Sequence, residues 1–255
     1  MERNALPYAG KMRSGNLYIG TSGWHYPHWV GTFYPTGMAS EEFLPYYARH
    51  FSTVEINSTF YHLPTSDTLT HWRNQTPRNF LFTCKGSRYL THIKKLKDPQ
   101  DGIHRFFEAA TKLHSKLGPI LFQLPPRWKK NIPRLEAFLN ALPGEFRYAF
   151  EFRDTRWFDK EVYQLLEAHQ AGFCLYHLAG QWAPEIVTAN FVYIRLHGPG
   201  AAYQGTYNQS MLRAWAHKCR NWHSAGKDVY CYFDNDEQGY APLNALTLLQ
   251  YLHTG

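Results

Sequence analysis

The chain has 255 residues, of which 44% are hydrophobic and 17% aromatic, and its formal net charge is +7. This composition excludes an intrinsically disordered protein and is sufficient for a large core in one or two domains. The excess of positive charge favours an anionic partner but does not identify one.

Cysteine spacing and the absence of long apolar runs indicate the cellular compartment in which we expect the protein. The four cysteines, Cys84, Cys174, Cys219 and Cys231, are far apart and form no CxxC pair. This spacing predicts buried thiols in a reducing compartment rather than a disulfide framework or a zinc finger. No apolar run reaches the ~20 residues that a membrane helix needs, and no signal-peptide core follows the first methionine. We therefore expect a cytoplasmic protein, with no membrane partner, in which residues 1–16 form a loose N-terminal leader.

Strand-like and helix-like segments alternate from residue 17 onward. Runs rich in β-branched and aromatic residues predict strands at 17–21, 53–57, 80–84, 120–124, 148–152, 173–176, 191–196 and 228–233. Apolar periodicity and capping residues predict helices at 40–50, 66–75, 99–117, 132–142, 159–171, 209–225 and 241–252. The connection between the sixth and seventh strands, through Trp182 and Pro184, is short, and a helix there is doubtful.

This alternation over residues 17–255, without a break in composition, predicts a single α/β domain with the (β/α)₈ TIM-type barrel fold. A doubly wound open sheet is the alternative, but no glycine-rich phosphate loop follows the first strand. A long loop rich in aromatic residues, glycine and proline follows the first strand at 24–37. Because loops after barrel strands lie at the catalytic face, this loop is a candidate lid.

The strand expected at residues 53–57 shows most clearly which side chains enter the barrel. Val54 and Ile56 fall on one face, whereas Glu55 and Asn57 fall on the other. We assign the apolar face of each strand to the surrounding helices and the polar face to the barrel interior. The same rule places further polar residues inside, mostly at the carboxyl ends of the strands: Lys85, Gln123, Glu151, Arg153, His177, Arg195, His197 and Asp234.

This polar set has a structural and a functional interpretation. Any single glutamate, Glu55 or Glu151, is accounted for by a structural ion pair with Arg153 or Arg195. A barrel interior that needed only stability would hold layers of Val, Ile and Leu, so the whole set favours a polar ligand. In that interpretation Lys85, Arg153 and Arg195 clamp an anionic group, with Asn57 and Gln123 beside them, and the catalytic candidates are Glu55, Glu151, His197 and Asp234.

A divalent metal is an open alternative, and we predict no specific cofactor. His177, His197, Glu55, Glu151 and either Asp234 or Asp236 are ligand types that zinc or manganese accepts. Against a metal, the chain has no HxxxH or HxH spacing, and three cations are expected in the same mouth.

Aromatic residues gather in the expected loops after the strands. Each one alone is most simply a packing residue, but several on one rim would suit stacking against sugars or bases. They are Trp24, Tyr26, Trp29, Phe33, Tyr34, Phe60, Tyr61, Trp128, Trp157, Trp182 and Tyr203, of which Trp24 and Tyr61 are our candidates for substrate binding. Two short basic runs, KKLK at 94–97 and RWKK at 127–130, are either solvated surface or a footprint for a phosphate backbone.

With these motifs assembled, the chain resembles the YecE-like family, also called domain of unknown function 72. The resemblance rests on GTSGW at 20–24, FYP at 33–35, TVEINSTFY at 53–61, LFQLPP at 121–126, EFR at 151–153 with Trp157, YIRLHG at 193–198, and FDND at 233–236 with NA at 244–245. It covers nearly the whole chain from Leu17 onward and implies a TIM-type barrel. It implies no particular reaction.

The chain departs from the pattern of the family at two places. Asp154 stands where the family often has His after Glu-Phe-Arg, and Asp234 begins a triplet that is often Asn-Asn-Asp. Our leading hypothesis is a phosphoester hydrolase that acts on an anionic small molecule or a nucleic acid. The alternatives are a sugar or sugar-phosphate isomerase or lyase, and a non-catalytic module that binds nucleic acid or carbohydrate.

Overall fold

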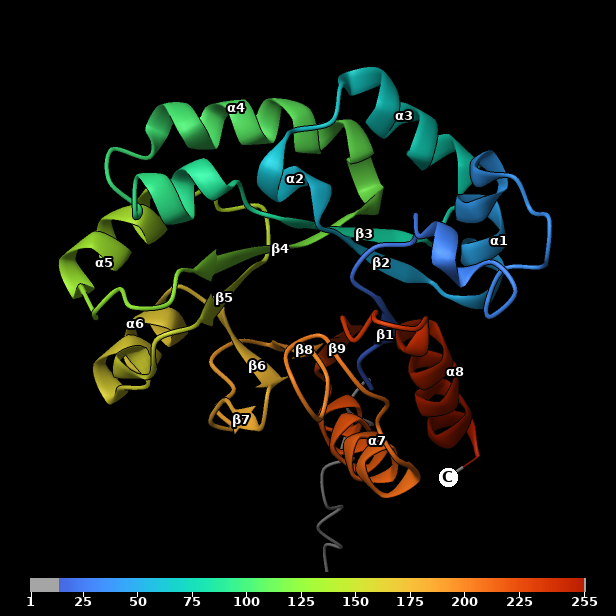
Figure 1. Cartoon of the computed structure of the whole chain (residues 1–255). Coiled ribbons are helices and arrows are strands. Elements are labelled where there is room, and N and C mark those ends of the chain that lie inside the picture. The colour runs from blue at the N-terminus through green and yellow to red at the C-terminus, as the bar shows by residue number, and fades with distance from the viewer. Residues whose placement is uncertain (1–13, 255) are drawn as a thin grey trace, which may run out of the picture.

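Eight parallel strands follow one another around a barrel in this computed structural model, which describes residues 14–254 (Figure 1). Residues 1–13 of the expected leader therefore lie outside the described residues. The hydrogen-bonded order is β1-β9-β8-β6-β5-β4-β3-β2. The barrel strands are β1 Leu17–Thr21, β2 Thr53–Ile56, β3 Leu81–Lys85, β4 Leu117–Leu124, β5 Tyr148–Phe152, β6 Gly172–Leu178, β8 Phe191–Leu196 and β9 Asp228–Phe233. The predicted (β/α)₈ barrel is confirmed.

The barrel closes between β1 and β2 by a short contact rather than a full ladder. Ser22 and Glu55 form a single parallel bridge, and the amide of Gly23 donates to the Glu55 carbonyl at 2.8 Å. Gly20 permits this approach, because a Cβ atom at its position would lie 2.3 Å from the carbonyl oxygen of Thr53. The seam therefore ends beside the glutamate that the sequence singled out.

Helices form an outer ring around these strands (Figure 1). The helices are α1 Phe43–His50, α2 Ser58–Tyr61, α3 Ser66–Gln75, α4 Gln100–Ala110, α5 Ile132–Ala141, α6 Lys160–Ala168, α7 Gln209–Ser224 and α8 Tyr240–His253. Side chains of Thr65, Asn131, Asp159 and Asn208 cap α3, α5, α6 and α7, respectively, by accepting from a backbone amide of the first turn. The sequence did not predict the four-residue α2, which directly follows β2.

The connection from β6 to β8 contains no helix. A two-residue strand, β7 Gln181–Trp182, turns back and pairs antiparallel with the end of β6. The doubtful helix at this connection is therefore absent from the described chain.

The interior below the polar groups is filled by side chains. Leu121, Ala149, Cys174, Tyr193 and Tyr232 belong to one buried cluster. The larger apolar cluster includes residues of the helices and of the opposite strand faces. All four cysteines are buried and free, as their spacing predicted. Within residues 14–254, no helix is both long and apolar enough to cross a membrane.

Candidate functional site

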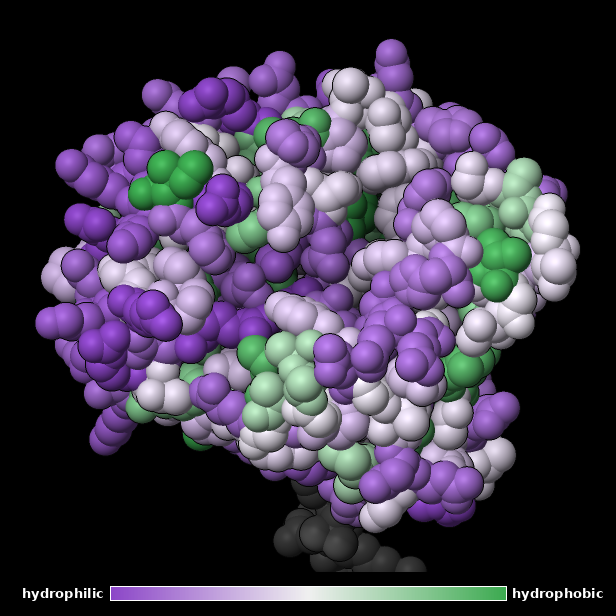
Figure 2. Space-filling model, in the orientation of Figure 1, coloured by the Kyte–Doolittle hydropathy of each residue, from purple (hydrophilic) through white to green (hydrophobic). Residues whose placement is uncertain are grey.

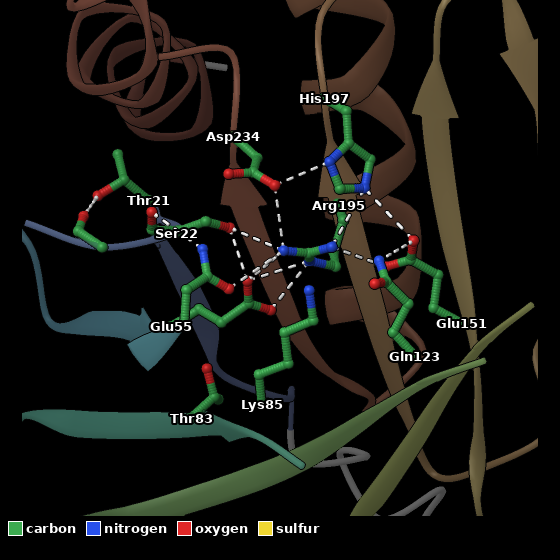
Figure 3. Close-up of polar contacts among 12 residues, drawn as sticks. Thr21, Ser22, Glu55, Thr83, Lys85, Gln123, Glu151, Arg195, His197 and Asp234 are labelled. Carbon is green, nitrogen blue, oxygen red and sulfur yellow. Dashed lines mark hydrogen bonds and ion pairs between the residues drawn. The ribbon is translucent and has the colours of Figure 1, made fainter. Parts of the chain in front are cut away.

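The guanidinium of Arg195, on β8, lies at the centre of the polar cluster (Figure 3). Its Nη2 atom is 2.6 Å from Glu55 Oε1 and 3.1 Å from Asp234 Oδ2, and its Nη1 atom is 2.8 Å from Glu151 Oε2. Only 1% of the Arg195 side chain is exposed. One buried cation thus joins carboxylates that come from β2, from β5 and from the residue after β9.

Glu55 has no carboxylate oxygen left for a substrate. The Ser22 hydroxyl donates to Oε1 at 2.6 Å, and the Tyr193 hydroxyl donates to Oε2 at 2.6 Å. Arg195 Nε lies 3.0 Å from both oxygens, and the side chain is fully buried. These contacts indicate that Glu55 positions Arg195 and joins the seam between β1 and β2.

Glu151, on β5, is held in a similar way. Its Oε1 atom accepts from Gln123 Nε2 at 2.9 Å and from Arg153 Nε, while Oε2 accepts from Arg195. Burial alone would raise the pKa of Glu151, but the two guanidinium groups outweigh it and hold the pKa well below its usual range. Glu151 is therefore ionised at neutral pH and is poorly suited to act as a general acid.

His197 bridges two parts of the cluster. Its Nε2 atom lies 3.0 Å from Arg153 Nη2 and 3.3 Å from Arg195 Nη1. Guanidinium nitrogens only donate, so Nε2 accepts, and the hydrogen on Nδ1 is donated to Asp234 Oδ2 at 2.9 Å. His197 therefore uses both ring nitrogens, and its Nε2 atom also lies 3.6 Å from Glu151 Oε1. Asp234 keeps one oxygen, Oδ1, without a hydrogen bond to any described residue.

Lys85, at the end of β3, is the cation that the cluster leaves without a partner in the described chain. Its amine points toward Arg195 in Figure 3, yet no carboxylate within residues 14–254 lies within 4.0 Å of it. The amine lies over the ring of Phe60, 4.4 Å from the ring centroid. Burial, and then the positive charge of Arg195, lower the pKa of Lys85 to about 8.

Further cations surround the mouth of the barrel. Burial, and then the positive charges of Lys85, Arg88 and Arg153, lower the pKa of His92 to about 4. These cations therefore lie close enough to act on one imidazole. Figure 2 shows a hollow near the centre of this face with hydrophilic residues around it.

Three of the residues expected at the site lie elsewhere or at its edge. His177 faces outward, with its ring stacked 3.7 Å from Trp182 and its Nδ1 atom 3.2 Å from the Tyr207 hydroxyl. Its assignment to the interior was wrong, because both faces of β6 are apolar and the pattern did not distinguish them. Trp24 is buried against Trp72 rather than exposed at the mouth. Tyr61 is 70% exposed on α2.

The remaining candidate, Asn57, lies at the edge of the cluster. Its Oδ1 atom is 3.5 Å from Arg195 Nη2, and its Nδ2 atom donates to the carbonyl of Ser22 at 3.4 Å. The structure therefore brings together nine of the residues predicted from strand parity: Glu55, Asn57, Lys85, Gln123, Glu151, Arg153, Arg195, His197 and Asp234.

The aromatic loop at 24–37 is packed rather than open. Trp29 and Tyr34 are almost fully buried, and Trp29 Nε1 donates to Asp236 after β9. Tyr34 stacks on Phe43 of α1, with ring centroids 4.2 Å apart. Most of the expected aromatic rim is therefore core, and the members of that set that are exposed are Tyr61, Trp182 and Tyr203.

The residues of the cluster do not fit a metal ion. Within residues 14–254, no group of three or more His, Cys, Asp and Glu side chains is arranged to hold one. Glu55, Glu151 and Asp234 converge on Arg195 instead, and His177 lies outside the cluster. The other metal candidate, Asp236, contacts Trp29 and His28.

The two departures from the family pattern have different roles. Asp154 caps the short turn Thr155–Trp157, where its Oδ1 atom accepts from the amide of Arg156 at 3.0 Å. Asp234 contacts Arg195 Nη2 at 3.1 Å and His197 Nδ1 at 2.9 Å through its Oδ2 atom. The second departure therefore belongs to the polar cluster.

Two contributors were missed from the sequence. Ser22 and Tyr193 hold the two oxygens of Glu55. Tyr193 is two residues before Arg195, so the two side chains share a face of the strand. The alternation could therefore have placed Tyr193 in the barrel interior. Ser22 follows β1, beyond the last residue of the strand, so the alternation along the strand does not assign it to the interior.

Comparisons with known proteins agree with this architecture. The profile of a family described as "Protein of unknown function DUF72" matches residues 18–255. The chain is 30% identical over 262 residues to the UPF0759 protein YecE of Escherichia coli K12, covering 92% of each chain. It is 28% identical over 270 residues to the UPF0759 protein YunF of Bacillus subtilis, covering 92% of this chain and 94% of YunF.

A solved structure shows the same fold. The crystal structure of a DUF72 family protein from Thermotoga maritima MSB8 superposes with a TM-score of 0.85 at 28% identity. The match covers 93% of this chain and 99% of the Thermotoga chain.

Proposed function

Since the chain belongs to the DUF72 family, whose description names no activity, we propose its function from the barrel mouth itself: an enzyme that binds an anionic, phosphorylated substrate there. The observation that supports this proposal is the group of cations at the mouth. Lys85 has no described carboxylate partner, and Arg88 and Arg153 lie close enough to act on the same imidazole. An anion placed among them would relieve their mutual repulsion.

Arg153 is the main binding residue of this proposed anion site. Its Nε and Nη2 atoms are held by Glu151 and His197, and its guanidinium lies over the ring of Tyr176 at 5.4 Å. The Nη1 atom makes no hydrogen bond within the described chain. A guanidinium fixed on one edge, with a free donor on the other, is suited to binding a phosphate oxygen.

Phosphoester hydrolysis, the reaction favoured from the sequence, gains no support from these contacts. Glu55 and Glu151 were its acid-base candidates, and their oxygens are engaged by neighbouring donors. Proton transfer on a sugar phosphate, as in an isomerase or lyase, is better supported. Lys85 and Asp234 each keep a functional atom at the mouth that no hydrogen bond from residues 14–254 engages.

A thermal-shift series tests the anion site. We expect inorganic phosphate and sugar phosphates to raise the melting temperature, because a ligand that binds only the folded state stabilises it. Arg153→Met is expected to reduce this rise. Arg49→Met, which removes an exposed charge from the last turn of α1, is the matched control and should leave it unchanged. An equal response in both variants would contradict the proposal.

Titration with oligonucleotides separates a small substrate from a nucleic-acid strand. A strand held through several phosphates would bind with an affinity that falls steeply with salt. Binding of this kind, together with no turnover of any sugar phosphate, would favour the non-catalytic module over the enzyme.

A further inference from the structure

We infer that Lys85 is a nucleophilic amine that forms an imine with its substrate, so that the anionic substrate of this mouth also carries an aldehyde or ketone group. This inference deepens the proposed function and rests on it for the anionic group. It assigns to Lys85 covalent chemistry rather than charge alone.

The backbone around Lys85 is held in place. The Thr59 hydroxyl on α2 donates to the Lys85 carbonyl at 2.7 Å. The next residue, Gly86, lies so close to β4 that a Cβ atom there would be 2.4 Å from the ring of Phe122. The side chain therefore extends from a fixed point at the end of β3, where the residues that act on substrate lie in barrels of this kind.

The surroundings of the amine differ from those of the other cations in the cluster. Arg153 and Arg195 each donate to carboxylates, whereas no described carboxylate lies within 4.0 Å of the Lys85 amine. On one side it meets the apolar ring of Phe60, and the nearby guanidinium of Arg195 adds a like charge. The carboxylates of Glu151, Glu55 and Asp234 act on the pKa of Lys85 in the opposite direction, but burial and Arg195 outweigh them. A lysine that is desolvated and placed beside another cation is the usual form of a nucleophilic amine.

The lowered pKa, about 8, agrees with this geometry. At pH 7 about a tenth of such amines are neutral, against roughly one in 3,000 for a lysine of ordinary pKa. The neutral amine carries the lone pair that attacks a carbonyl carbon. The fraction able to react is thus larger by a factor of about 300.

The proposed step balances without a further reactant. The nitrogen lone pair of Lys85 forms a C–N bond to the carbonyl carbon, and the C–O bond breaks. The two amine hydrogens leave with the oxygen as water, so that a C=N bond remains. Attack by water reverses the sequence and restores the free amine.

Pyridoxal 5′-phosphate is a suitable probe, because it joins an aldehyde to a phosphate group. We would incubate the protein with it, reduce any imine with borohydride, and locate the modified lysine by peptide mass mapping. We expect saturable labelling at Lys85, half-maximal near pH 8, and competition by inorganic phosphate. Lys85→Arg, which keeps a cation, should remove this site, whereas Lys160→Arg on α6 should leave it unchanged.

The outcomes separate the inference from the function on which it rests. Labelling at Lys85 no faster than at exposed lysines would overturn the inference, and phosphate binding in the thermal-shift series would still support the anion site. Equal labelling by pyridoxal, which lacks the phosphate, would support the reactive amine and contradict the anionic substrate. A melting temperature of Lys85→Arg close to that of the wild type shows that lost labelling is not lost folding.

Discussion

Three carboxylates meet one guanidinium inside this barrel, and this arrangement is the first feature to test at the scale of single residues. Arg195→Met keeps most of the volume of the side chain but leaves Glu55, Glu151 and Asp234 buried without their shared cation. Breaking a buried ion pair by removing one partner costs roughly 3–5 kcal/mol. We expect a loss of at least this size in the free energy of unfolding, measured in urea.

The same measurement distinguishes a structural Arg195 from a substrate clamp. Arg49→Met serves as the control and should change the free energy of unfolding by less than about 0.5 kcal/mol. An Arg195→Met variant as stable as the wild type, but unable to bind phosphate, would show that Arg195 holds substrate.

Lys85 provides a prediction with a defined pH window. Its pKa is about 8 in the folded protein, against 10.5 for an ordinary lysine, so the folded state disfavours the charge. Between these values the unfolded chain binds more protons, and the wild type gains stability as the pH rises. Lys85→Met should therefore be more stable than the wild type at pH 7, by about 1–3 kcal/mol.

Urea unfolding at pH 7 and near pH 10 checks this sign. The advantage of Lys85→Met should shrink at the higher pH, where the amine in the folded wild type has lost its proton and its burial no longer opposes a charge. A constant difference between the two proteins would contradict the lowered pKa.

The alternation of side chains along each strand predicted most residues of the polar cluster, but it did not predict which of them pair with one another. Glu55, Glu151 and Arg195 were placed in the interior because alternating residues of a strand share a face. That Arg195 would engage both glutamates depends on the relative height of β2, β5 and β8, which no single strand contains. His177 was assigned to the wrong face because both faces of β6 are apolar, so the alternation did not show which face points into the barrel.

At the scale of elements, the seam between β1 and β2 is the most sensitive junction of the barrel. Gly20→Ala would place a Cβ atom 2.3 Å from the Thr53 carbonyl oxygen, and backbone has to shift to relieve the contact. Overpacking of this kind typically costs 1–3 kcal/mol. We expect about 3 kcal/mol, together with faster hydrogen exchange at the amide of Gly23, which bonds across the seam.

Gly144→Ala is the matched control for this substitution. A Cβ atom at Gly144 meets nothing within 4 Å, so the free energy of unfolding should stay within about 0.5 kcal/mol of the wild type. If Gly20→Ala were equally neutral, β1 and β2 would not be in the close contact described.

The elements that the sequence missed are short. The helix α2 has four residues and β7 has two, and both are shorter than the stretch over which a helical or strand period can be recognised. The buried aromatic loop at 24–37 was misjudged for a different reason. Its aromatic residues pack on α1 and on one another. Contacts of this kind do not produce a periodic pattern in the sequence, so they could not be predicted from it.

At the scale of the whole molecule, the alternation of strands and helices was enough to predict the barrel, which the strand order and the Thermotoga structure confirm.

The buried carboxylates of the barrel predict how the stability of the protein changes at acidic pH. Burial raises the pKa of Glu151 and Asp234, but Arg195 and its neighbours lower both below their usual values. Carboxylates of this kind add stability above pH ~4, and the contribution is lost as the pH falls through their folded pKa.

We therefore expect the free energy of unfolding to decline by a few kcal/mol between pH 6 and pH 3. Urea unfolding at a series of pH values measures this slope. Glu151→Gln removes one of the two titrating groups and should give a shallower decline, whereas an identical slope would assign the acid sensitivity to other residues.

Anomalous diffraction from crystals soaked in tungstate, a phosphate mimic, would show whether the mouth of this barrel binds an anion. We expect an anomalous peak at the mouth, within hydrogen-bonding distance of Arg153 and beside Lys85. Peaks confined to exposed lysines, with the mouth holding none, would contradict it.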